Sequence, residues 1–247
     1  MTDRALYLYT DFGLEGPYVG QMRAAVAAVD PRLQVVDLCH DLAPFRPRPA
    51  AYLLAALAPW LPEGSVCVAV VDPGVGGARD ALVLEADGRR YVGPDNGLLA
   101  VVARRARTAR WWTITWRPGR LSASFHGRDL FAPVGARLAA GQAVALAPRA
   151  AGDHVGADWP EDLAEVIYVD RYGNAMTGLR AGGLAPDARL EAGGRLLARA
   201  RTFCDVPPGA AFWYENANGL AEIAVNQGRA DQALGLAVGA PVRVHFP

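Results

Sequence analysis

The stretch VCVAVVDPGVGGAR, residues 66–79, decides the fold of this chain. Its first six residues are apolar and mostly β-branched, which predicts a strand buried on both faces, as in a parallel sheet. Ligands of open α/β sheets bind outside the carboxyl ends of the strands, so Asp72 is a candidate site residue. The glycines that follow permit positive φ, and such a loop can bring Arg79 back to Asp72. The alternative is a tight structural turn with a surface ion pair.

Strand and helix patterns alternate around this stretch and predict an α/β domain. The predicted strands are 5–9, 33–38, 66–71, 81–86, 90–92 and 111–116, with Asp87-Gly88 as a hairpin turn between the fourth and fifth. The predicted helices are 17–29, 48–60, 96–105 and 127–140. This order predicts a mostly parallel sheet covered by helices on both faces.

The pattern changes after a loose stretch rich in Ala, Pro, Gly and Asp, residues 147–160. The strands predicted beyond it are 165–170, 188–191, 196–203, 211–214, 221–225 and 242–246, with a helical turn at 231–234. Short strands separated by Gly and Pro predict a smaller all-β domain, barrel-like or a sandwich. We therefore predict an α/β domain over residues 1–155 and a β-barrel domain over 156–247.

Composition limits the possible functions. The 247 residues carry 25 basic and 25 acidic side chains, so no net field favours nucleic acid or a membrane surface. Every basic residue is arginine, which excludes Schiff-base chemistry by lysine. The three cysteines lack paired spacing and are expected to be free thiols in a reducing compartment. With neither a signal-peptide pattern nor a long apolar run, the protein is expected to be cytoplasmic.

Three further motifs of the first domain carry polar side chains at strand ends or helix starts. Asp11, in TDFG after the first strand, is placed to hydrogen-bond a ribose diol, or alternatively to cap a turn. Asn96, in GPDNG, is a candidate substrate-binding residue, although capping the next helix is favoured. His126, in FHGRD, precedes a helix start and is the side chain best suited to hold a proton near neutral pH. The four histidines lack metal-ligand spacing, so no metal site is expected.

The second domain repeats the arrangement of a carboxylate at a strand end. Asp170, Tyr172 and Asn174 lie in DRYGN, a set that can hold a ligand amine and stack on a purine ring. A β-turn with Asp and Gly in their usual positions is the alternative. Asn218, in NANGLAEIAVN, is a further candidate for contacts with a polar ligand.

The ordered set TDFG, DPGVG-x-x-R, GPDNG, FHGRD-x-FAP, D-x-[FY]-GN and NGL-x-EIA-x-N spans residues 10–226. It resembles the S-adenosyl-L-methionine (SAM) hydroxide adenosyltransferase family, relatives of the SAM-dependent chlorinases and fluorinases. The resemblance implies an α/β domain followed by a β-barrel, and a homotrimer with SAM bound at subunit interfaces. It also implies conversion of SAM and water to adenosine and L-methionine, with SAM as substrate and no cofactor.

The resemblance assigns residue roles that agree with the motifs. It implies a water-handling triad of Asp72, Arg79 and His126, and a ribose-binding Asp11. It further implies that Asp170 holds the methionine ammonium. Tyr172 and Asn174 match residues near the adenine, and Phe45 stands where halogenating relatives carry a tryptophan lining the ligand.

The chain also departs from its halogenating relatives. They carry a tyrosine in place of Asp72 and a halide-binding serine in place of Gly127. An anionic Asp72 would repel halide and accept a hydrogen bond from water, which favours oxygen transfer. Ala217 replaces a family serine near the methionine carboxylate, and Asn218 is a possible substitute.

The implied reaction is in-line attack of water on C5′ of the ribose, with either Asp72 or His126 as the base. The thioether leaves as a neutral group, so catalysis is mainly the positioning of water. Two alternatives stay open: a SAM-dependent halogenase, and a SAM or adenosine sensor without significant turnover.

Overall fold

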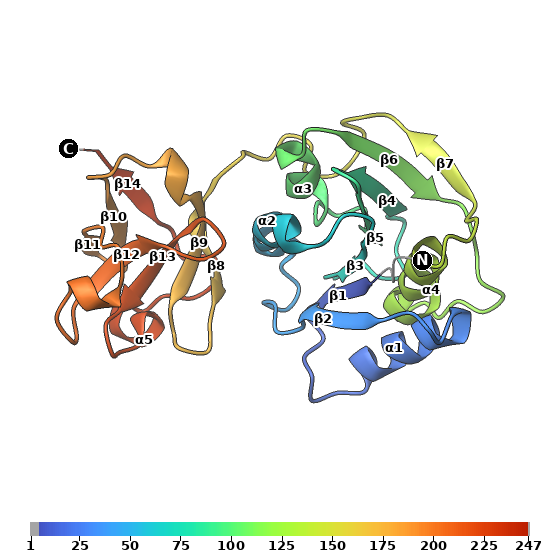
Figure 1. The fold of residues 1–247 in the computed structure, drawn as a ribbon, viewed down its shortest axis with the longest axis horizontal. Coiled ribbons are helices and arrows are strands. Elements are labelled where there is room, and N and C mark those ends of the chain that lie inside the picture. The colour runs from blue at the N-terminus through green and yellow to red at the C-terminus, as the bar shows by residue number, and fades with distance from the viewer. Residues whose placement is uncertain (1–4, 247) are drawn as a thin grey trace. The chain divides into compact units, whose positions relative to one another are not determined.

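The computed structural model describes residues 5–246, and its contacts divide the chain into two compact units between Trp159 and Pro160 (Figure 1). The sequence placed this boundary between residues 155 and 156. Residues 1–4 and 247 lie outside the described range, and with them the chain start on which the signal-peptide prediction rests. No helix within residues 5–246 is long and apolar enough to cross a membrane.

The first unit is built on a seven-stranded mixed sheet. In spatial order its strands are β2 (Val35–Cys39), β1 (Leu6–Thr10), β3 (Val66–Val70), β5 (Arg89–Pro94), β4 (Ala81–Ala86), β6 (Ala109–Ile114) and β7 (Leu146–Arg149). The first four are parallel, and the last three add in antiparallel pairs. Strand β3 is buried along its whole length, as its apolar sequence predicts. The α/β class and the parallel centre of the sheet are confirmed.

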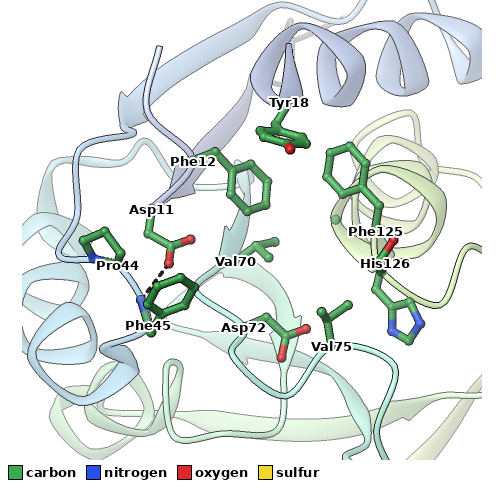
Figure 2. A pocket seen from close by; sticks show the side chains of 12 residues that line it. Asp11, Phe12, Tyr18, Pro44, Phe45, Val70, Asp72, Val75, Phe125 and His126 are labelled. Atoms are coloured by element: carbon green, nitrogen blue, oxygen red, sulfur yellow. Dashed lines mark hydrogen bonds between the residues drawn. The ribbon is translucent and has the colours of Figure 1, made fainter. Parts of the chain in front are cut away.

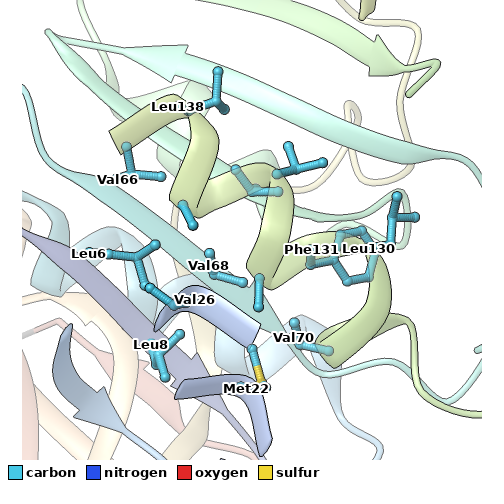
Figure 3. Packing of buried hydrophobic residues seen from close by; sticks show 14 of the residues in the cluster. Leu6, Leu8, Met22, Val26, Val66, Val68, Val70, Leu130, Phe131 and Leu138 are labelled. Carbon is cyan, nitrogen blue, oxygen red and sulfur yellow. The ribbon is translucent and has the colours of Figure 1, made fainter. Parts of the chain in front are cut away.

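Helices cover both faces of this sheet (Figure 1). They are α1 (Tyr18–Val29), α2 (Pro47–Leu57), α3 (Ala100–Arg105) and α4 (Ala132–Ala139). Met22 and Val26 of α1 pack with α4 against alternate residues of β1 and β3 (Figure 3). Gly135 lets α4 lie close on the sheet, because a Cβ there would meet the side chain of Val68. This packing fixes where α4 begins, next to the carboxyl ends of β1 and β3.

Four predicted elements of the first unit differ from the structure. The loose stretch 147–160 contains the end of β7, an edge strand that pairs only with β6 and holds Pro148, so it lacks the usual strand pattern. The helix predicted from residue 96 begins at Ala100, since Asn96 Oδ1 accepts from the N–H of Leu98 in a turn.

The helix predicted over 127–140 opens instead with a π-helical turn, η2 (Gly127–Phe131), in which Ala132 N–H donates to the carbonyl of Gly127. Pro133 cannot donate to the carbonyl four residues earlier, which favours this wider turn. Likewise the end of the helix predicted over 48–60 is a 3₁₀ turn, η1 (Ala58–Trp60), that contains Pro59.

The second unit holds two antiparallel sheets. One is β12 (Ala211–Glu215), β13 (Leu220–Val225), β9 (Ala175–Arg180) and β8 (Leu163–Val169), and the other is β11 (Arg195–Leu197), β10 (Arg189–Ala192) and β14 (Arg243–His245). The short helical elements are η3 (Ala181–Gly183), η4 (Phe203–Asp205) and α5 (Ala230–Leu234). The all-β class is confirmed, whereas closure into a barrel stays a prediction.

Two elements of this unit differ from what the sequence predicts. Strand β9 was not predicted. The strand predicted over 196–203 ends at Leu197, because Thr202 and Asp205 form a capping box around η4 and draw the chain into a 3₁₀ turn.

Candidate active site

A cavity of about 380 Å³ opens at the carboxyl edge of the sheet in the first unit. Asp11 follows β1, Asp72 follows β3, and His126 precedes η2, so topology alone brings three distant motifs together. Figure 2 shows Asp11 and Phe45 on one side of the cavity and Phe125 and His126 on the other. The rest of the lining is mostly apolar or aromatic: Phe12, Tyr18, Pro44, Val70, Val75, Ser124 and Gly127.

Asp11 is held in place by the backbone of Phe45. The N–H of Phe45 donates to Asp11 Oδ2 at 3.0 Å, with Phe45 at a positive φ of 63°. A bulky residue rarely adopts this conformation, so the loop stores strain that the Asp11 contact offsets. Burial raises the pKa of Asp11, while the hydrogen bond from Phe45 opposes that shift. The Phe45 ring is 74% exposed, which leaves its face open to a ligand.

Asp72, Arg79 and His126 form one connected cluster. Arg79 donates to both carboxylate oxygens of Asp72, through Nε at 3.0 Å and through Nη2. The same Nη2 lies 3.0 Å from His126 Nδ1. The Asp72 and Arg79 side chains are only 5% and 12% exposed, and the Arg79 guanidinium lies over the ring of Phe131 at 5.2 Å. The three residues predicted as a triad therefore meet, with Arg79 behind the two that line the cavity.

This geometry sets the tautomer of His126. A guanidinium has no acceptor, so Nδ1 must accept from Arg79 and the ring proton resides on Nε2. Burial, and then the positive charge of Arg79, lower the pKa of His126, which keeps the ring neutral. His126 is consequently a hydrogen-bond donor through Nε2. Asp72 is then the one member of the triad that can accept a further hydrogen bond, because its carboxylate has more acceptor sites than Arg79 occupies.

The π-helical turn places Gly127 at the cavity wall. A Cβ at this position would lie 3.2 Å from the Phe125 ring and 3.3 Å from the Phe12 ring. These two rings pack edge to face, with centroids 5.7 Å apart. A larger side chain would therefore press on the aromatic wall.

Asn96 lies outside this cavity's lining. Its Nδ2 donates to the carbonyl of Val71 at 2.8 Å, one residue before Asp72. Both ends of the amide are thus used within the protein, and a contact with substrate stays a prediction for Asn96.

The second unit has its own cavity, of about 640 Å³. It brings together the predicted Asp170, Tyr172 and Asn174, and Phe203, Tyr214, Val225, Gln227, Gly228 and Arg229 line it as well. Asp170 accepts from Asn174, through the backbone N–H at 2.8 Å and Nδ2 at 3.1 Å. The Tyr172 ring is 74% exposed.

Two features near this cavity were outside the sequence prediction. Glu222 is 2% exposed and accepts from Tyr214 Oη at 3.0 Å and Asn216 Nδ2 at 2.6 Å. Its only sequence signal was a charge within an alternating strand. Arg229 is tied to Asp231 and to the carbonyl of Arg171. Asn218 lies in the turn after Asn216 and does not line the cavity, so its contact with a ligand stays a prediction.

Metal-binding geometry is not found among residues 5–246, where no three His, Cys, Asp or Glu side chains are grouped to hold an ion. The cavities present carboxylates, amides and aromatic rings instead. This donor set suits an organic ligand with hydroxyl, amine and aromatic groups.

Residues 6–147 match the model of the SAM hydroxide adenosyltransferase N-terminal domain, and residues 164–243 match the model of its C-terminal domain. A protein of Thermus thermophilus named (R)-S-adenosyl-L-methionine hydrolase is 44% identical, with 98% of this chain and 99% of the relative aligned. A protein of Salinispora arenicola with the same name is 39% identical over 95% of each chain. A fluorinase of Actinopolyspora mzabensis is 26% identical over 53% of each chain.

Solved structures agree with these matches. An uncharacterised conserved protein of Thermotoga maritima superimposes with a TM-score of 0.83 at 30% identity, covering 98% of this chain and all of the other. A conserved hypothetical protein of Thermus thermophilus gives a TM-score of 0.76 at 39% identity, with the same coverage. The chain belongs to the SAM hydroxide adenosyltransferase family.

Proposed function

We propose that this protein is an enzyme that hydrolyses SAM to adenosine and L-methionine. The observation that carries the proposal is the Asp72–Arg79–His126 cluster at the carboxyl end of β3. The chain aligns over nearly its full length with a SAM hydrolase. Asp72 and His126 face a cavity that also presents Asp11, a carboxylate suited to a ribose diol.

The cluster suggests how water is prepared for attack on C5′. Arg79 uses its N–H groups to fix Asp72 and His126 and does not line the cavity. His126 donates from Nε2 to the water oxygen, and Asp72 accepts the proton as the C5′–O bond forms and the C5′–S bond breaks. The electron pair of the broken bond stays on sulfur, which leaves as neutral methionine. Asp72 is therefore the proposed base.

Hydrolysis is favoured over halogenation by the cavity wall. A serine at Gly127, as halogenating relatives carry, would press on Phe125 and Phe12. The carboxylate of Asp72 lines the same cavity and disfavours an anion. A sensor without turnover would have no need of a fixed donor and acceptor at the reacting carbon.

The second cavity is proposed to hold the remainder of the substrate. Asp170 would bind the methionine ammonium, with Tyr172 and Asn174 near the adenine. We further propose a homotrimer in the cytoplasm, in which the sites lie at subunit interfaces. Sedimentation of the purified protein tests the trimer, and a monomer with full activity would exclude it.

The substrate is proposed to be the epimer with R configuration at sulfur, which the names of the related hydrolases specify. Inversion at the sulfonium sulfur exchanges the positions of the methyl group and the methionine chain relative to the ribose. In-line attack therefore proceeds in a fixed cavity for one epimer more readily than for the other.

Incubation with each SAM epimer in ¹⁸O-labelled water tests the reaction. We expect adenosine labelled at its 5′ oxygen, together with unlabelled methionine, and faster loss of the R epimer. Intact SAM after long incubation with folded protein would overturn the proposal. Formation of 5′-chloroadenosine in chloride buffer would favour a halogenase instead.

A further inference from the structure

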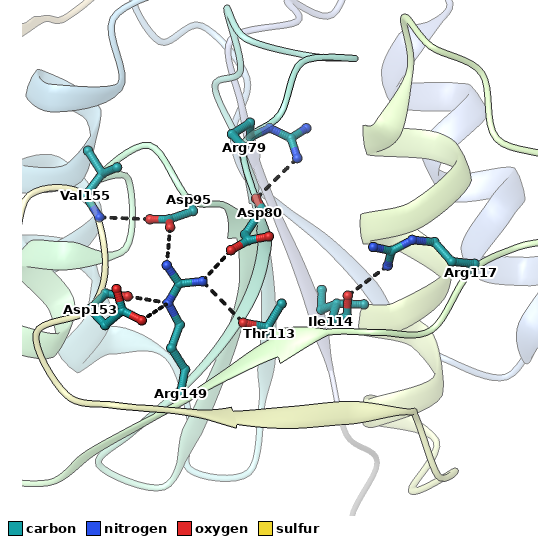
Figure 4. A network of polar contacts seen from close by, with 9 residues as sticks. All are labelled: Arg79, Asp80, Asp95, Thr113, Ile114, Arg117, Arg149, Asp153 and Val155. Carbon is teal, nitrogen blue, oxygen red and sulfur yellow. Dashed lines mark hydrogen bonds and ion pairs between the residues drawn. The ribbon is translucent and has the colours of Figure 1, made fainter.

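Arg149, the last residue of β7, lies at the centre of a polar network that extends to Asp80 and Arg79 (Figure 4). Its side chain is 12% exposed. Nη1 donates to Asp80 Oδ2 at 2.7 Å, and Nη2 donates to Asp95 Oδ2 at 2.8 Å. Nη1 also reaches Thr113 Oγ1 at 3.2 Å, and Nε donates to the carbonyl of Asp153. One guanidinium therefore joins its own segment to three others that are distant in the sequence, at Asp80, Asp95 and Thr113.

One arm of the network reaches Arg79. Asp80 directly follows Arg79, and the carbonyl of Asp80 accepts from Arg79 Nη1 at 3.3 Å and from the N–H of Asp95 at 3.0 Å. With its side chain held by Arg149, Asp80 fixes both the backbone and the guanidinium of its neighbour. The planar guanidinium of Arg149 can hold Asp80 and Asp95 at once, because its Nη1 and Nη2 groups donate in two fixed directions.

The other arm reaches Asp72. Asp95 is 9% exposed, and its second oxygen accepts from the N–H of Val155 at 2.9 Å. Its neighbour Asn96 donates to the carbonyl of Val71, which precedes Asp72. The two arms thus hold the two ends of the glycine loop, residues 72–79, from behind.

We infer that Arg149 is a positioning residue for the reaction: it sets the relative placement of Asp72 and Arg79, and through Arg79 the tautomer of His126. Among the residues that the structure describes, the hydrogen-bond partners of Arg149 include no triad residue, and Arg149 is not part of the cavity lining. The inference rests on the proposed SAM hydrolysis for its kinetic consequence, but its effect on His126 is independent of turnover.

Kinetics of Arg149→Lys, Arg149→Gln and Asp80→Asn provide the first test. We expect kcat to fall roughly 10-fold for Arg149→Lys and about 100-fold for Arg149→Gln, with KM for SAM within about twofold, because displacement of reacting groups slows chemistry more than binding. Asp80→Asn, at a half-exposed residue, should fold readily and lower kcat by roughly threefold, since one arm is weakened.

Arg89 offers a matched control in the same unit. It begins β5, whose other end leads to Asp95, and its guanidinium donates to the carbonyls of Leu61 and Asp87. Arg89→Gln removes a guanidinium that also joins distant segments, but at the end of β5 opposite to Asp95. We expect a lower Tm but an unchanged kcat. If Arg149 variants lowered kcat no more than Arg89→Gln at equal loss of Tm, Arg149 would be structural only and the inference would be wrong.

The ring nitrogens of His126 provide the second readout. ¹⁵N spectra of histidine-labelled protein should show Nδ1 of His126 as an unprotonated acceptor in the wild type and a mixture of tautomers in Arg149→Gln. His126→Gln identifies the signal. An unchanged tautomer in Arg149→Gln would overturn the inference even if the wild type did not hydrolyse SAM. Failure of wild-type turnover with the expected tautomer shift would overturn only the proposed function.

Discussion

The two cavities differ in how their polar groups are held. In the first unit, the carboxylate, guanidinium and imidazole of Asp72, Arg79 and His126 are bonded to one another and to a second network behind them. In the second unit, both carboxylate oxygens of Asp170 accept from Asn174, four residues along the chain. A reacting atom needs groups fixed in direction, whereas an ammonium needs a nearby charge. This difference supports the proposal that the reaction takes place in the first cavity and that the second cavity serves for binding.

The cavities share one feature, an aromatic ring at the rim. Phe45 and Tyr172 are each 74% exposed. An aromatic face left to solvent is a surface on which a planar or apolar ligand group can pack. Each cavity therefore presents an exposed aromatic face at its rim.

The largest expected effect is on Asp72. We expect Asp72→Asn to lower kcat by roughly 10²–10⁴-fold, the range for loss of a proton acceptor, with a small change in KM. The amide oxygen can still accept one of the two hydrogen bonds from Arg79, but the amide takes up no proton. Single-turnover kinetics with a saturating enzyme concentration measure this step directly. A rate within tenfold of the wild type would show that Asp72 is not the base.

Asp170→Asn should show the opposite pattern. A hydrogen bond to a charged group contributes about 1.5–3 kcal/mol, so KM for SAM is expected to rise roughly 10- to 100-fold while kcat changes little. The asparagine oxygen can still accept from the backbone N–H of Asn174, which preserves the turn. A large loss of kcat at unchanged KM would contradict the division between chemistry and binding.

The acid limb of the pH profile sharpens the role of His126. Burial and Arg79 lower its pKa from 6.5, opposed by Asp72 and Asp129, while Arg117 lowers it further. A proton on Nδ1 would face the Arg79 N–H, so the cluster should break as pH falls through this lowered pKa. We expect kcat to fall about tenfold per pH unit below it. The folded protein binds this proton less tightly than the unfolded chain, so the free energy of unfolding rises with pH from the lowered pKa up to the ordinary value of 6.5.

A measurement of kcat from pH 4.5 to 8, with ¹⁵N titration of His126, tests both statements. An acid limb set by His126 above pH 6.5 would mean that the ring is stabilised in its protonated form. In that case Nδ1 would not accept from Arg79, and His126 would regain the role of base.

The smallest expected effect concerns stability. Burial raises the pKa of Asp11, so the folded state binds this proton more tightly than the unfolded chain, and the ionised form costs stability at neutral pH. Asp11→Asn should therefore raise Tm slightly at pH 7 while weakening SAM binding. The gain should shrink as pH falls through the raised pKa, since the wild-type carboxyl then takes up its proton.

Asp231→Asn is the matched control for this sign. The hydrogen bond from Arg229 holds the pKa of Asp231 below its usual value. Replacing this carboxylate by an amide should therefore lower Tm at pH 7. Scanning calorimetry of both variants compares the two directions. A lower Tm for Asp11→Asn would show that the contact with Phe45 needs the full charge and stabilises the loop more than burial costs.

Local sequence patterns predicted most of the first unit. The buried β3 strand, the Asp87-Gly88 hairpin and helix α1 follow from apolar periodicity and turn chemistry, which act over a few residues. The two missed strands, β7 and β9, are short or contain Pro or Gly, so their pairing depends on partners far along the chain.

The sequence by itself determined that carboxylates follow β1, β3 and β8, because a strand end is marked by where the apolar run stops. Only the tertiary structure decided what those carboxylates contact. Arg149 lies in a stretch with no motif, and its partners Asp80 and Asp95 become its neighbours only when β7 pairs with β6 at the edge of the sheet. The tautomer of His126 likewise depends on one N–H of Arg79, 47 residues away. Such contacts depend on how whole elements pack, so a pattern of nearby residues cannot predict them.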